Sequence, residues 1–293
     1  MNITKTNLNE EAKSRYMNAY AQSLELWPED TKSYYIRTLF GDTHVLETGV
    51  EDNPPLILLH GGSMSSTMWY PNVSEWNKHY RVLAIDILGD KNKSVPEKTY
   101  NDREDHAKWL AETLDEMQIK ESKMVGLSYG ALNLINFLQY YPNRVSKGVI
   151  MSPAETFVPF NPEFYTYAFG MVQNEKGVDN FLEWLFNDRY TVHSYIKEQL
   201  VSGMMWIEEA RGSKPKSSGF PYVFTDDELS TIQTDLLLLL GENEVMYNPS
   251  EVIARATRVV PTITVELVEK AGHLVSMEQS TYINKRVLDY LRG

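Results

Sequence analysis

The chain has 293 residues, 42% of them hydrophobic and 23% charged, which suits one large globular domain or a core with an inserted subdomain. Its 28 Lys and Arg against 40 Asp and Glu give a formal net charge of −12, and an acidic surface repels phosphate backbones, so we expect no nucleic-acid partner. The chain has no cysteine, which excludes disulfides, a thiol nucleophile and cysteine-ligated zinc.

The sequence gives no membrane or export signal. The N-terminal residues lack the apolar stretch of a signal peptide. The longest apolar run, at residues 236–240, is too short to span a bilayer. We therefore expect a cytoplasmic protein with no membrane span.

Strand-like and helix-like runs alternate along most of the chain. Residues 9–27 carry small and aromatic residues at helical spacing, which predicts an amphipathic helix docked on the body of the protein. Two strand-like runs follow, separated by Gly41 and Asp42, a hairpin signal. Continuous apolar runs, typical of parallel strands buried on both faces, then alternate with helical runs. The strand-like runs lie at 55–62, 80–89, 123–130, 147–155, 236–242 and 264–273, and the helical runs at 102–117, 131–141, 250–258 and 279–291.

This alternation predicts an α/β fold with a doubly wound, mostly parallel sheet. Residues 155–224 break the rhythm, because they are rich in aromatic residues and end in a polar stretch with several glycines and prolines. We interpret them as a helical insertion. The predicted organisation is an N-terminal helix packed on the core at 1–33, an α/β core at 34–154 and 226–293, and a helical cap at 155–225.

Residues 125–133 read VGLSYGALN and place Ser128 between Gly126 and Gly130. An apolar strand-like run leads into this segment and an apolar helix-like run leaves it. Strained backbone angles at such a junction lift a serine hydroxyl above the sheet edge, and flanking glycines make room for the tight turn. The pattern predicts a nucleophilic serine; the alternative is a serine that caps an ordinary helix.

A serine hydroxyl needs a base to take its proton, and the chain has six histidines. His273 lies in a loop between the last predicted strand and the last predicted helix, at the carboxyl edge of the sheet where ligands bind. His60 ends a strand before two glycines and is expected to shape that turn. The other histidines are less favourably placed for catalysis: His44, His79, His106 and His193.

The third member of a serine–histidine pair is a carboxylate that orients the imidazole. Glu244 follows an apolar strand and gives the chain order serine, acid, histidine, but Glu242 and Glu155 also follow strands and stay open as alternatives. The oxyanion of an acyl-transfer reaction needs backbone N–H donors. Gly62, in a glycine turn after a strand, and Tyr129, next to the serine, can supply them.

These ordered motifs resemble those of the α/β-hydrolase superfamily, from about residue 35 to 291. The segments similar to its oxyanion loop, its following strand and loop, its nucleophile elbow, its acid loop and its histidine loop are residues 58–69, 80–94, 125–145, 236–245 and 270–279. The resemblance implies Ser128 as nucleophile, His273 as base and Glu244 as third member of the triad. It implies Gly62 and Tyr129 as oxyanion-hole residues.

Two positions depart from the family pattern. Glu244 stands where the family usually has aspartate. Lys91 and Asn92 stand where a second glycine is usual, which predicts a differently shaped loop after Asp86. We interpret Asp86 as a structural residue.

The resemblance implies a carboxylesterase-like serine hydrolase of class EC 3.1 that works through an acyl-enzyme. The aromatic insertion indicates a largely apolar pocket, so we expect a small, largely apolar ester as substrate. The alternatives are a ligand-binding sensor with little turnover, a carbon–carbon hydrolase, an acyltransferase or a haloperoxidase-like enzyme. No histidine pair has metal-ligand spacing, so we expect neither a metal nor a cofactor. A small-molecule substrate is the expected partner, and a homo-oligomer is compatible with the sequence.

Overall fold

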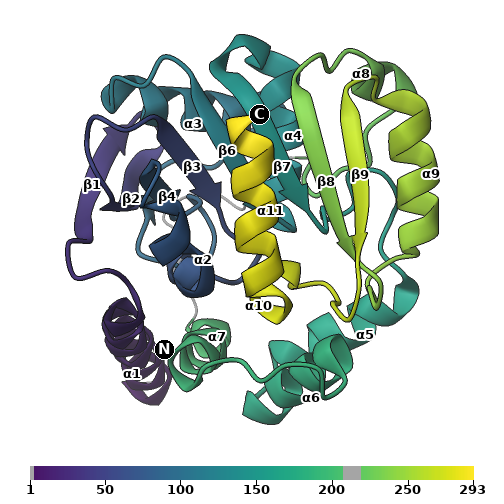
Figure 1. Ribbon diagram of the computed structural model, residues 1–293. Helices are drawn as coiled ribbons and strands as arrows, with labels where there is room; N and C mark the ends of the chain where they lie inside the picture. The colour runs from purple at the N-terminus through teal and green to yellow at the C-terminus, as the bar shows by residue number, and fades with distance from the viewer. Residues whose placement is uncertain (1–2, 207–218) are drawn as a thin grey trace.

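The computed structural model describes residues 3–206 and 219–293 (Figure 1). Within those residues, nine strands form one sheet in the order β1-β2-β4-β3-β6-β7-β8-β9, with β5 paired to β2. The strands are β1 (Lys32–Thr38), β2 (Gly41–Thr48), β3 (Pro55–Leu59), β4 (Arg81–Ile85), β5 (Val95–Pro96), β6 (Ser122–Leu127), β7 (Val145–Met151), β8 (Asp235–Gly241) and β9 (Ile263–Val268).

Most of the sheet is parallel. Every pairing from β4 through β3, β6, β7 and β8 to β9 is parallel. Among the described strands, antiparallel pairing is confined to β2 with β1, β4 and β5. Residues 236–240 of β8 are fully buried, as expected for a strand covered on both faces. The predicted α/β fold with a doubly wound, mostly parallel sheet is confirmed.

The first hairpin is present, but its turn is not where the sequence placed it. Thr38 pairs with Gly41, so Leu39 and Phe40 form the turn. Gly41 instead begins β2 with a φ of 142° and faces the backbone of β5, where a Cβ atom would overlap the carbonyl oxygen of Val95. The glycine is required by this close approach of a third strand rather than by the turn.

Helices cover both faces of the sheet. Helices α2 and α11 lie on one face, and α3 and α4 on the other (Figure 1). The described helices outside residues 155–225 are α1 (Ile3–Ser23), α2 (Tyr70–Trp76), α3 (Arg103–Glu116), α4 (Tyr129–Tyr140), α8 (Asp226–Ser230), α9 (Pro249–Val259), α10 (Val275–Glu278) and α11 (Ser280–Arg292), with short 3₁₀ turns at Leu24–Leu26, Ser66–Trp69 and Pro142–Arg144.

Three further helices lie within residues 155–225, the segment predicted as the cap, and precede α8 in the connection between β7 and β8. They are α5 (Pro162–Met171), α6 (Glu175–Phe186) and α7 (Ser194–Met205), and they lie beyond the carboxyl ends of the parallel strands (Figure 1). Helix α1 packs against α7, and Arg15 of α1 forms an ion pair with Glu198 of α7. Residues 207–218, which include most of the predicted polar stretch, lie outside the described residues.

Asp86, at the end of β4, is the centre of a buried polar network. One carboxylate oxygen accepts from the N–H of Ser66 at 2.8 Å, and the other accepts from His44 Nδ1 at 2.9 Å and from the Tyr20 hydroxyl at 3.1 Å. Burial alone would raise the pKa of Asp86, but the hydrogen bond from His44 and the positive potential of His44 outweigh it and lower the pKa to about 2. Asp86 thereby ties α1, β2 and the loop after β3 to one point, which supports its interpretation as a structural residue.

Replacing Asp86 with asparagine is expected to lower the free energy of unfolding at neutral pH by about 3 kcal/mol, because a buried paired charge is lost. A lowered carboxyl pKa stabilises the fold above about pH 4, and that contribution is lost as the pH falls towards 2. The gap between wild type and Asp86→Asn in urea titrations should therefore shrink by about 2 kcal/mol from pH 5 to pH 2. A gap that is constant with pH would contradict this account.

Over the ranges that the structure describes, none of the helices combines the length and the apolar character needed to cross a bilayer.

Candidate active site

Ser128 joins the end of β6 to the start of α4 in a strained conformation. Its φ is 52° and its ψ is −112°, a region that costs a residue with a side chain about 1 kcal/mol or more. The N–H of Ser128 donates to the carbonyl of Met151 at 2.9 Å, and its carbonyl accepts from Ala154 N at 3.1 Å. Met151 ends β7 and Ala154 lies just after it, so the neighbouring strand holds the turn in place.

The two glycines beside Ser128 let three backbones approach closely. A Cβ atom on Gly126 would lie 2.5 Å from the carbonyl oxygen of Gly130. A Cβ atom on Gly130 would overlap the carbonyl oxygen of Leu59, the last residue of β3. Side chains at either position would force β6, α4 and β3 apart. The strand–turn–helix junction predicted from VGLSYGALN is present.

The loop after β3 brings Gly62 next to Tyr129. A Cβ atom on Gly62 would lie 3.5 Å from the Cβ of Tyr129. Over residues 3–206 and 219–293, the N–H of Gly62 has no hydrogen-bond partner. Tyr129 is the first residue of α4, so its N–H has no acceptor within the helix. Two uncommitted N–H groups thus lie on adjacent segments beside Ser128.

A partly buried carboxylate, that of Asp90, shapes the same loop. Both oxygens of Asp90 accept from the N–H of Ser63, at 3.1 and 2.9 Å. Burial raises the pKa of Asp90. Ser63 follows Gly62 and has a φ of 61°, so Asp90 holds a strained residue next to one of the two N–H donors.

His60 and Asn92 support the neighbouring turns. His60 Nδ1 donates to the carbonyl of Gly61 at 2.8 Å, and its Nε2 accepts from the N–H of Ile87 at 2.8 Å. His60 therefore shapes the glycine turn, as the sequence predicted. Asn92 Nδ2 donates to the carbonyl of Ile87 at 2.7 Å, so a side chain stabilises the loop where the family usually has glycine.

His273 and Glu244 form a buried pair. His273 Nδ1 lies 2.8 Å from Glu244 Oε2, and the Glu244 side chain is completely inaccessible to solvent. Glu244 Oε1 accepts from the N–H groups of Val245 and Met246 at 2.9 Å each. An ionised carboxylate fixed in this way accepts the Nδ1 proton and leaves Nε2 as a lone-pair acceptor. Nε2 is buried and, within the part of the chain that the structure describes, has no hydrogen-bond partner.

The other acids considered from the sequence lie elsewhere. Glu242 is exposed, and its carboxylate accepts from the N–H of Lys270. Glu155 accepts from the hydroxyl of Tyr165. Among the three candidates, Glu244 alone contacts His273 in the described structure.

The other histidines have different surroundings. His106 is buried against the ring of Phe220, with ring centroids 4.3 Å apart, and burial lowers its pKa to about 4. His193 caps α7, and His79 is exposed.

A cavity of about 210 Å³ brings the predicted site residues together. Gly62, Ser128, Tyr129 and His273 line its base. Its walls come largely from the helices between β7 and β8, including Phe164, Phe181, Leu185, Ile196 and Leu200. Within the described residues, no Lys, Arg, Asp or Glu lines it, so it is suited to an uncharged apolar group.

Comparison with known proteins places this arrangement in a family. A family model described as alpha/beta hydrolase fold matches residues 54–280. The chain belongs to the α/β-hydrolase fold family. It is 49% identical over 279 residues to a Bacillus subtilis protein named uncharacterized carboxylesterase nap, covering 95% of this chain and 93% of that one. It is 44% identical to carboxylesterase YbfK of the same organism, covering 95% and 94%.

A solved relative agrees with these matches. The crystal structure of naproxen esterase from Bacillus subtilis superposes with a TM-score of 0.92 at 48% identity, covering 96% of this chain and 98% of that one. The prediction of a carboxylesterase-like enzyme with the α/β-hydrolase fold is confirmed.

Asp90 was not among the residues predicted from the sequence. Its contact with Ser63 depends on loop geometry that no motif encodes.

Proposed function

We propose that this α/β hydrolase is a carboxylesterase that cleaves small, largely apolar esters through Ser128, His273 and Glu244. The observation that carries the proposal is the Glu244–His273 pair, which leaves an uncommitted Nε2 in the same cavity as Ser128. Nε2 in this state can take a proton from a hydroxyl. The likeness to relatives named carboxylesterases favours an ester substrate.

In the proposed first step, the Ser128 oxygen attacks the ester carbonyl while His273 Nε2 takes its proton. Glu244 keeps the imidazole in the required tautomer and stabilises its charged form. The N–H groups of Gly62 and Tyr129 would then donate to the oxyanion, a type of contact that contributes about 3 kcal/mol per donor. His273 passes the proton to the leaving alcohol, and an acyl-Ser128 ester remains.

In the proposed second step, His273 takes a proton from water, which attacks the acyl carbonyl. The same two N–H groups stabilise the second oxyanion, and collapse of that intermediate releases the acid and restores Ser128. We further propose that residues 155–225 act as a cap, because their helices supply most of the apolar wall above Ser128.

A panel of p-nitrophenyl esters, a matched thioester and a matched anilide tests the reaction class. We expect turnover of short and medium esters with stoichiometric product acids. Binding of apolar acids without turnover of any ester would favour a ligand-binding sensor. Cleavage confined to the carbon–carbon bonds of β-diketones would favour a carbon–carbon hydrolase.

Charge on the acyl group should matter strongly. A hemisuccinate ester is expected to have a kcat/KM about 100-fold or more below that of the butyrate ester of equal length, because no described Lys or Arg lines the cavity to pair with a buried carboxylate. Both esters are measured on the same leaving group at pH 7 and low ionic strength. Equal kcat/KM values for the two esters would contradict an uncharged acyl pocket.

A further inference from the structure

A second buried carboxylate, that of Glu278, lies next to the histidine loop. Glu278 ends α10, five residues after His273, and its side chain is completely inaccessible. Arg189, in the segment between α6 and α7, donates through Nε to Glu278 Oε2 at 3.0 Å. Nη2 of the same arginine donates to the carbonyl of Leu185 at 2.8 Å. One guanidinium therefore joins the end of α6 to the segment that carries His273.

The residue before His273 packs directly on this pair. A Cβ atom on Gly272 would overlap Arg189 Nη2 and would lie 3.2 Å from Glu278 Oε1. It would also lie 3.2 Å from the carbonyl oxygen of Asn243, the residue before Glu244. The ion pair, the histidine loop and the acid loop are thus in contact around one glycine.

Arg189 offsets part of the cost of burying the Glu278 carboxyl group. Burial raises the pKa of Glu278, and the hydrogen bond from Arg189 and nearby backbone N–H groups offset that effect only in part. Within the described residues, Oε1 has no hydrogen-bond partner. Removing the guanidinium would leave an unpaired buried carboxylate beside Gly272, and such charges are strongly destabilising locally.

We propose that Arg189 and Glu278 are positioning residues that hold the His273 loop in register with Ser128 and couple it to the helical segment above. The inference rests on the proposed role of His273. It concerns kcat rather than substrate binding, because neither residue lines the cavity at Ser128. A small displacement of a catalytic base from remote changes can cost a large factor in rate.

Steady-state kinetics of Arg189→Gln and Glu278→Gln test the proposal. Each variant should lose about 10- to 100-fold in kcat, while KM changes by less than about threefold. The double variant should be no slower than Arg189→Gln, because both residues act through one contact. The control is the Arg286–Glu266 pair, which is partly exposed on both sides and joins α11 to β9 away from the loop. Arg286→Gln should keep the wild-type kcat.

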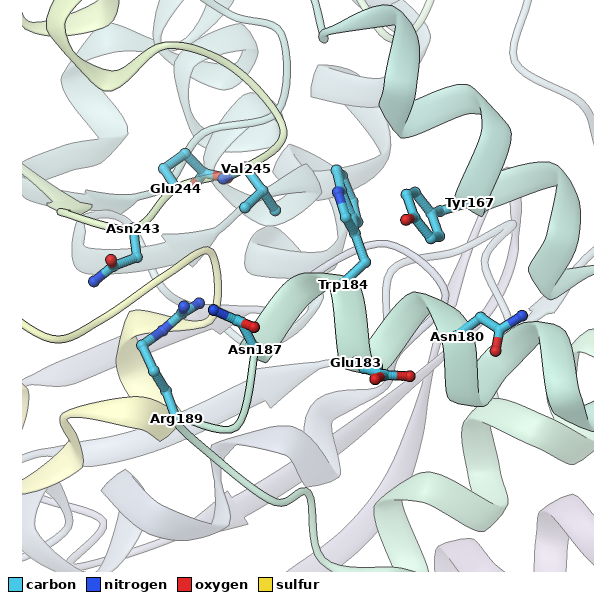
Figure 2. Close-up of a pocket in the computed structure, with 9 residues that line it drawn as sticks. All are labelled: Tyr167, Asn180, Glu183, Trp184, Asn187, Arg189, Asn243, Glu244 and Val245. Atoms are coloured by element: carbon cyan, nitrogen blue, oxygen red, sulfur yellow. The ribbon is translucent and has the colours of Figure 1, made fainter.

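Rescue of kcat by added guanidinium gives a second, independent test, because a cleft leads to Arg189. Arg189 and Glu244 both line a cleft of about 690 Å³, and Figure 2 shows the Arg189 side chain beside Asn187. Truncation in Arg189→Ala would connect that cleft to the Glu278 carboxylate. Added guanidinium, well below denaturing concentrations, should then restore part of kcat in Arg189→Ala but not in Glu278→Gln.

The outcomes separate the possibilities. A lower melting temperature with an unchanged kcat in Arg189→Gln would show that the pair is merely structural, and a raised KM alone would assign it to substrate binding; either result overturns the inference. If Arg189→Gln does not fold, Arg189→Lys and the guanidinium experiment decide instead. An active Ser128→Ala enzyme would refute the proposed function itself, whereas an inactive one beside a fully active Arg189→Gln would refute this inference alone.

Discussion

Replacing Ser128 with alanine is expected to lower kcat for ester hydrolysis by about 10⁴-fold or more. Alanine removes the hydroxyl that the proposed mechanism acylates. Alanine and serine both carry a Cβ atom, so the backbone strain at a φ of 52° should be about the same in both and the fold should be retained. Hydrolysis of a p-nitrophenyl ester, followed spectrophotometrically, measures the loss.

Two controls make this result interpretable. Thermal unfolding of Ser128→Ala should match the wild type closely, because the change removes a single oxygen atom. His273→Ala should show a loss of similar size, and the two changes together should be hardly worse than either alone, because the residues act as a unit. Wild-type turnover by Ser128→Ala would exclude this serine as the nucleophile.

The second large effect is expected from Glu244→Gln, which should lower kcat by about 10²- to 10⁴-fold. The glutamine oxygen can still accept from the N–H groups of Val245 and Met246, which leaves the amide NH₂ facing His273 Nδ1. An NH₂ donor favours the tautomer with its proton on Nε2, and that tautomer cannot accept the proton of Ser128.

The matched control for this change is Glu242→Gln, two residues earlier and exposed. It should keep kcat within about twofold of the wild type, as ordinary surface substitutions do. A large loss in Glu242→Gln or Glu155→Gln, with Glu244→Gln unaffected, would assign the acid role elsewhere.

The parts of the fold with regular patterns could be predicted from the sequence. Buried parallel strands give continuous apolar runs, so residues 236–240 indicated a central strand by themselves. The predicted position of the first hairpin turn was wrong because Gly41 is needed for its close contact with β5, a strand more than 50 residues later in the chain. A local signal cannot distinguish a glycine needed for a turn from one needed for a distant close approach.

The candidate site could be predicted where its signals are local and not where it depends on contacts between distant segments. Ser128 carries a local signature, since its two glycines are required by contacts within one strand–turn–helix unit. The choice of Glu244 over Glu242 depends on how two loops meet, and only the hydrogen bond to His273 distinguishes them. The contact of Arg189 with Glu278 joins residues 89 positions apart and has no pattern in the sequence.

Covalent trapping with a fluorophosphonate, followed by intact-mass analysis and peptide mapping, tests the central claim most directly. We expect one adduct per chain, on the peptide that contains Ser128, formed in step with the loss of esterase activity and much more slowly in His273→Ala. An adduct on another residue, or esterase activity that persists in protein fully labelled at Ser128, would contradict the account.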